Sequence, residues 1–100
     1  MLYGNWLSKS RQAGEMLTRG QFERSIEIYS EVALAFPRLP EAHNNLGVAL
    51  RASGEINQAI KSYQKAIKLD PNYMIARKNL ARAFWQTEKI EEALDNYIFL

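Results

Sequence analysis

The sequence has no cysteine, a single histidine and little net charge. Without cysteine the chain cannot form a disulfide, a thiolate zinc site or an iron–sulfur cluster, and it has no cysteine nucleophile. His43 alone cannot supply an imidazole-rich metal site. The net charge of +2, from 13 Lys and Arg against 11 Asp and Glu, is too small for a general binder of nucleic acid or membrane surfaces. We therefore expect no metal, cofactor, nucleic acid or membrane among its ligands.

Long apolar runs are also absent. No stretch approaches the roughly 20 apolar residues that a membrane-spanning helix needs, and the N-terminal residues lack the basic segment and apolar run of a secretory signal. We expect a cytoplasmic protein on these grounds. The chain has 100 residues, of which 47% are apolar, which is the composition and length of one globular domain.

Similar residues recur along the chain at an interval of 34 positions. The recurring sets are Tyr29, Tyr63 and Tyr97; Gly20 and Gly54; Pro37 and Pro71; Asn45 and Asn79; Ala13, Gly47 and Ala81; and Ser25, Ala59 and Ala93. This periodicity predicts a single domain over residues 1–100 that is built from units 6–39, 40–73 and 74–100. The last unit holds 27 of the 34 residues.

Each unit has room for two helices. In the second unit the apolar spacing predicts helices at about 40–53 and about 56–69. Gly54 lies between them, where a helix C-terminus favours a residue that tolerates positive φ. Pro40 suits the first position of a helix, and Pro71 follows the second helix, where it stops propagation. Because no run alternates with period two for long enough to indicate a strand, the fold is predicted to be all-α.

The second unit reads His43-x2-Leu46-Gly47-x2-Leu50, then Ala59-x3-Tyr63, then Pro71. This resembles the tetratricopeptide repeat (TPR), a helix–turn–helix unit with the pattern W-x2-L-G-x2-Y, A-x3-F and P. The first and third units match more loosely. The resemblance implies an α-solenoid of antiparallel helix pairs, with about six helices in a right-handed superhelix that binds partners on its concave surface.

Small residues at Ala13, Gly47 and Ala81 are expected to let the two helices of a unit approach closely. Enlarging one of them should overpack the pair, and Gly47→Leu is expected to cost about 3 kcal/mol. Gly14 has no glycine at its sister positions and should weaken its helix by about 1 kcal/mol relative to alanine.

No constellation of residues indicates an enzyme. His43 occupies a column in which the family prefers a packed tryptophan, so we interpret it as a packing residue rather than a catalytic base. The neighbouring carboxylates Glu91 and Glu92 diverge by roughly 100° on a helix and are interpreted as surface charge. No glycine-rich phosphate loop follows a strand.

The family resemblance implies that the first helix of each unit lines the concave groove. Our candidate peptide contacts at these positions are Arg11, Asn44, Asn45, Arg51, Lys78, Asn79, Arg82 and Trp85. Among all residues at the groove positions, the charged ones are Arg11, Arg51, Lys78, Arg82 and Glu41, which give a net charge of +3. The rest of the chain then has a net charge of −1, because the whole chain carries +2. Basic charge is thus predicted to concentrate in the groove.

Two interpretations remain open for the asparagines. Asn45 and Asn79 resemble the asparagine ladder of O-linked GlcNAc transferase repeats, in which amides pair with a peptide backbone, but they also fit ordinary surface asparagines. Of the columns that form the chaperone-tail clamp in this family, the chain keeps only Asn45. Trp85 is either a clamp for an apolar side chain or a packing residue.

The main functional hypothesis is a non-enzymatic scaffold that binds an extended, acidic or polar peptide segment of another protein. The alternatives are a regulatory or substrate-presenting module of a larger enzyme, such as one similar to O-linked GlcNAc transferases, and a self-association module. The given sequence ends with the apolar residues Tyr97, Ile98, Phe99 and Leu100, and a solenoid needs a polar outer surface at its end. Two interpretations stay open: the array is cut from a longer one, which the truncated third unit favours, or the apolar end forms a homodimer.

Overall fold

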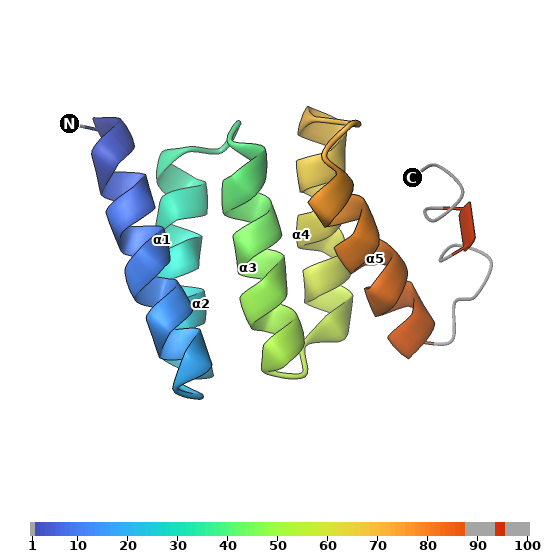
Figure 1. Cartoon of the computed structure of the whole chain (residues 1–100), viewed down its shortest axis with the longest axis horizontal. Coiled ribbons are helices and arrows are strands. Elements are labelled where there is room, and N and C mark those ends of the chain that lie inside the picture. Colours follow the sequence, from blue (N-terminus) through green and yellow to red (C-terminus); the bar gives the residue numbers. More distant parts are fainter. Residues whose placement is uncertain (1, 88–93, 96–100) are drawn as a thin grey trace.

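The computed structural model describes residues 2–87 together with 94 and 95, and side chains from residue 6 onward. Five helices follow one another through short connections (Figure 1). They are α1 (Leu2–Thr18), α2 (Phe22–Ala35), α3 (Pro40–Ala52), α4 (Ile56–Leu69) and α5 (Met74–Gln86). The described part of the chain contains no strand, so the predicted all-α fold is confirmed. A sixth helix was expected within 88–100, which lies outside the described residues apart from 94 and 95.

Glycine ends the first helix of each of the first two units, as the sequence predicts for Gly54. Gly20 and Gly54 have φ values of 78° and 93°. The Gly54 N–H donates to the Arg51 carbonyl at 3.0 Å and the next N–H, of Glu55, donates to the Leu50 carbonyl at 2.9 Å. This pair of bonds is a Schellman motif, which satisfies the last carbonyls of the helix and requires the left-handed conformation that glycine adopts without strain. The turn at Gly20 repeats the same pattern.

Prolines mark the other boundaries. Pro40 stands in the first turn of α3, where its missing N–H would have had no helical partner. The helix α4 ends at Leu69, two residues before Pro71. The observed bounds of α3 and α4 therefore agree with the predicted ranges to within one residue.

Small side chains allow the helices of a pair to pack closely. Ala13, Ala59 and Ala81 are completely buried, and a Cβ atom added to Gly47 would lie only 2.5 Å from Cε1 of Tyr63. Ser25 is also completely buried, and its hydroxyl donates to the Ala13 carbonyl at 2.9 Å. The close approach predicted for these columns is present.

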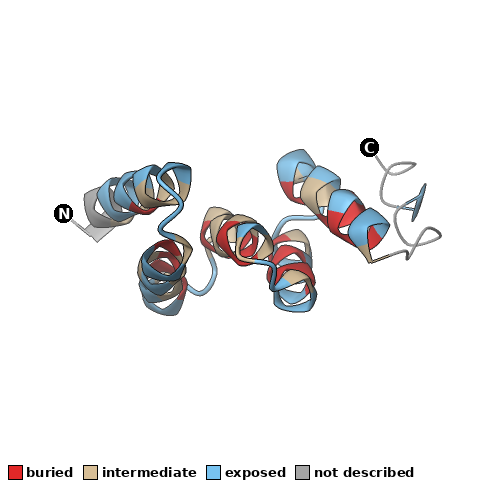
Figure 2. Ribbon diagram, turned by 90° about the horizontal axis from the view of Figure 1, so that it is seen from below, coloured by how far each residue is buried: buried red, intermediate tan, exposed pale blue. Residues whose placement is uncertain are grey.

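The helices form two layers. In Figure 2, α1, α3 and α5 lie on one side and α2 and α4 on the other, and α1 and α5 rise on either side of α3. Contacts join α1 to α3 and α3 to α5 within the first layer. We call the exposed surface of α1, α3 and α5 the inner face and that of α2 and α4 the outer face.

Candidate functional site

The inner face is formed by the sides of α1, α3 and α5 that point away from their partner helices. The opposite sides of these helices carry the buried columns, such as Gly47 against Tyr63 in α4. Because helical positions on the opposite face must then point outward, the predicted groove residues other than the buried Asn44 fall on the inner face.

The structure gives the predicted contacts different degrees of exposure. Arg11, Lys78, Arg82 and Trp85 are exposed, and 53% of the Trp85 surface is open to solvent. Asn45, Arg51 and Asn79 are half-buried, whereas Asn44 is buried. Seven of the eight candidates are therefore at least partly open to a ligand.

The cations of the inner face have no internal counterion. Within residues 6–87, Arg11, Arg51, Lys78 and Arg82 form no ion pair. The ion pair in this part of the chain joins Lys9 of α1 to Glu31 of α2 at 3.4 Å. None of these four cations is therefore neutralised by an ion pair within residues 6–87.

Asn44 links adjacent units rather than facing solvent. Its side chain is only 4% exposed, and its Oδ1 accepts a hydrogen bond from Nδ2 of Asn79 at 3.0 Å. Burial and, to a smaller extent, Glu41 and Asp70 raise the pKa of Tyr73, whereas the nearby Asn44 amide acts in the opposite direction. The sequence placed Asn44 among the peptide contacts, but the structure leaves it little surface for one, because α5 packs across it.

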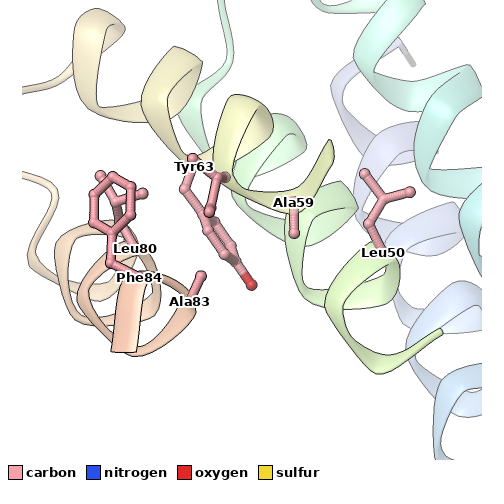
Figure 3. Packing of buried hydrophobic residues seen from close by; sticks show 7 residues of the cluster. Leu50, Ala59, Tyr63, Leu80, Ala83 and Phe84 are labelled. Atoms are coloured by element: carbon pink, nitrogen blue, oxygen red, sulfur yellow. The ribbon is translucent and has the colours of Figure 1, made fainter. Parts of the chain in front are cut away.

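Tyr63 of α4 is buried beneath the inner face, near the guanidinium groups of Arg51 and Arg82. Its side chain is completely buried, and Figure 3 shows its ring running from α4 between Ala83 of α5 and Leu50 of α3. Burial raises the pKa of the phenol, while the nearby guanidinium groups of Arg51 and Arg82 act in the opposite direction. Burial likewise raises the pKa of Tyr29, the equivalent residue of the first unit.

His43 is a packing residue, as the sequence indicates. It is 8% exposed, and its Nε2 lies 2.8 Å from the Pro37 carbonyl, to which an N–H at this position donates. Arg77, one repeat later, donates from Nε to the Pro71 carbonyl at 2.7 Å. Sequence reasoning missed this repeated bond, although the equivalent spacing of six residues in both units was visible. It ties the start of each new unit to the turn before it.

The outer face carries a feature that the sequence did not reveal. A hollow of about 410 Å³ opens between α2 and α4, lined by Leu34, His43, Ser62 and Lys65 among others. Leu34 at its edge is 83% exposed. The hollow arises from the distance between α2 and α4, which are separated by α3 in the sequence. A pattern of residue types along the chain does not predict such a distance.

Within the described residues, no three His, Cys, Asp or Glu side chains gather in a way that could hold a metal ion. None of the described helices combines the length and the apolar character needed to cross a bilayer.

A model of the tetratricopeptide repeat matches residues 40–73, the second unit. The chain belongs to the tetratricopeptide-repeat family. It is 31% identical over 72 residues to the small glutamine-rich TPR-containing protein 2 of Mycosarcoma maydis, a match that covers 72% of the chain and 20% of that protein. The chain spans 12% to 20% of the length of three curated relatives that it matches, this one included.

Solved TPR structures have the same fold. The Sgt2 TPR domain from Aspergillus fumigatus superposes with a TM-score of 0.91 at 21% identity, covering 95% of this chain and 63% of that one. The second TPR domain of Spaghetti (RPAP3), bound to the HSP90 peptide SRMEEVD, gives 0.87 at 23% identity, covering 94% and 87%. At these identities the likeness establishes the fold alone.

Proposed function

We propose that this TPR chain is a non-enzymatic scaffold that binds an extended, acidic or polar peptide segment of another protein along its inner face. The observation that carries the proposal is the unneutralised charge of Arg11, Arg51, Lys78 and Arg82, none of which has an ion pair within residues 6–87. Because opposite charges across an interface favour encounter and register, such a surface suits an acidic partner.

Asn45 supports binding of the peptide backbone. It is half-buried, and its side chain makes no hydrogen bond with the residues that the structure describes. A primary amide can donate and accept at once and therefore pairs with a peptide group whatever its side chain. Asn79 already donates one side-chain N–H to Asn44. Its side-chain carbonyl oxygen and its second N–H remain for hydrogen bonds to a peptide.

A structural neighbour gives further support. The second TPR domain of Spaghetti (RPAP3), which shares the fold, is bound to the peptide SRMEEVD, in which three of seven residues are acidic. This chain lacks most of the clamp columns of the family, so we expect acidic peptides to bind here through a different set of cations.

Fluorescence anisotropy with labelled peptides tests the proposal. The probes are SRMEEVD, its neutral counterpart with Gln and Asn in place of the acids, and a peptide array of varied acidic and neutral sequences. We expect at least one acidic peptide to bind, and Asn45→Ala and Arg82→Ala each to weaken it about tenfold.

Arg24→Ala is the matched control, because Arg24 is exposed on α2 and belongs to the outer face. Its affinity should equal that of the native chain. Equal binding of acidic and neutral peptides would refute the charge argument. Binding that survives both Asn45→Ala and Arg82→Ala would refute the inner face as the site.

A further inference from the structure

The two helices of the outer face expose charges of opposite sign. Helix α4 has no acidic residue, and its exposed charged side chains are Lys61, Lys65 and Lys68. Helix α2 has Arg24 as its one cation, and its exposed acidic side chains are Glu23, Glu27 and Glu31. Both helices lie on the same side of α3 (Figure 2), and within residues 6–87 no ion pair joins them.

The acidic row of α2 and the lysine row of α4 have the same spacing. Glu27 and Lys61 occupy equivalent positions of successive units, 34 residues apart, and so do Glu31 and Lys65. The two helices run in the same direction, because α3 returns the chain between them (Figure 1). Since Glu31 already pairs with Lys9, Glu27 and Lys61 are the matched charges that lack an ion pair within the described residues.

An apolar centre lies between the two charged rows. The hollow that separates α2 from α4 is lined in part by Ala33, Pro37 and Leu46, and Leu34 at its edge is 83% exposed. Specific protein interfaces combine a desolvated centre with a polar rim that stays accessible to solvent. The outer face therefore has both parts of such an interface, and the rim carries both signs of charge.

We infer that the outer face binds a second copy of this chain through a twofold axis that runs parallel to α2 and α4. Such an axis places α2 of each copy on α4 of the other, so that the contact between Glu27 and Lys61 occurs twice in the dimer. A twofold axis at right angles to the helices would place α2 on α2 and α4 on α4, with like charges opposed. The charge pattern thus selects the first arrangement. The inner face lies on the opposite side, so this inference does not depend on the proposed peptide binding.

The size of the outer face determines the strength of the dimer. Each of the two helices has 14 residues, which makes it about 21 Å long and about 10 Å wide. Two such helices present about 400 Å² per copy, roughly half of what a standard stable interface buries. We therefore expect a weak dimer that forms between about 0.1 and 1 mM protein.

Sedimentation equilibrium of the full chain over this concentration range tests the inference. Glu27→Lys and Lys61→Glu should each weaken the dimer about tenfold, because each change replaces two attractive contacts with two repulsive ones. An equimolar mixture of the two variants should regain the native affinity. Every contact between Glu27→Lys in one copy and Lys61→Glu in the other again joins opposite charges.

Matched controls change the same charges elsewhere. Glu15→Lys on α1 and Lys78→Glu on α5 alter exposed side chains that lie away from the outer face, so the affinity of the dimer should stay at the native value. Leu34→Ser should weaken the dimer about tenfold through the loss of apolar burial. Ile75→Ser on the inner face removes a side chain that is 58% exposed and should have no effect.

Three results would overturn the inference. The first is a chain that stays monomeric at about 1 mM protein, where even a small specific interface would be populated. The second is association that neither charge reversal weakens, which contact through the apolar residues 97–100 would produce. The third is a pair of variants that are each weakened but do not recover when they are mixed, because a twofold contact between Glu27 and Lys61 requires that recovery.

Discussion

Alanine at two helix-interior glycines should change stability in opposite directions. Gly47 in α3 and Gly14 in α1 both lie within helices, where glycine is less favourable than alanine by about 1 kcal/mol. Their surroundings differ. A Cβ at Gly47 would meet three ring carbons of Tyr63, at 2.5, 2.7 and 3.0 Å, whereas a Cβ at Gly14 would meet only the Tyr29 hydroxyl, at 3.4 Å.

The magnitude follows from these contacts. Tyr63 is completely buried, so its ring cannot swing into solvent. Because two of its ring carbons would lie within 2.7 Å of the added methyl group, the overpacking cost falls in the upper part of the usual range, at about 2 to 3 kcal/mol. Subtracting the helix gain leaves Gly47→Ala less stable than the native chain by about 1 to 2 kcal/mol. Gly14→Ala meets an ordinary van der Waals contact and keeps the gain, so it should be more stable by about 1 kcal/mol.

Thermal unfolding followed by circular dichroism measures both variants. A change of 1 kcal/mol shifts the midpoint of a chain of this size by about 4 to 8 °C, so the two midpoints should move apart on either side of the native one. A Gly47→Ala midpoint at or above the native value would refute the packing argument. Tyr63→Leu removes the ring carbons, and in that background Gly47→Ala should lose most of its cost, as a double-mutant cycle would show.

Other consequences are open to test. Ser25→Ala removes the hydroxyl that bonds to the Ala13 carbonyl, and should lower the free energy of unfolding in urea by about 1 kcal/mol; an unchanged urea midpoint would contradict it. His43→Phe keeps an aromatic ring but loses the bond to the Pro37 carbonyl, and should cost about the same amount, whereas equal stability would show that only packing matters there. Tyr29 and Tyr63, which are buried, and Tyr73, which is half-buried, have raised pKa values and therefore favour the neutral phenol in the folded state. Their contribution to stability is complete below the ordinary pKa of 10.0 and is lost as pH rises through the folded values, so the urea midpoint should fall above that pH, and a flat profile would refute this.

The 34-residue periodicity and the local sequence signals were sufficient to predict the helices. The interval of 34 predicted the units, and Gly54, Pro40 and Pro71 predicted the bounds of α3 and α4, because turns and helix ends depend on residues next to them in sequence. The exposed cations of the inner face, such as Arg82, were also correctly placed on the surface.

Contacts between units could not be predicted in the same way. The Asn79–Asn44 bond joins residues 35 positions apart, and its existence depends on how far α5 slides along α3, which the repeat pattern does not specify. A repeat column indicates which face a residue occupies, but not which neighbour in the adjacent unit it meets.

The Asn79–Asn44 bond links ligand binding to the shape of the array. In a repeat protein, stability is approximately a sum of unit terms and nearest-neighbour interface terms, and this bond belongs to the interface between α3 and α5. A peptide whose backbone hydrogen-bonds to the Asn79 amide in place of Asn44 would remove this contact from the interface. Tight peptides would then be those that leave this bond intact, and peptides that break it would change the curvature of the solenoid as they bind.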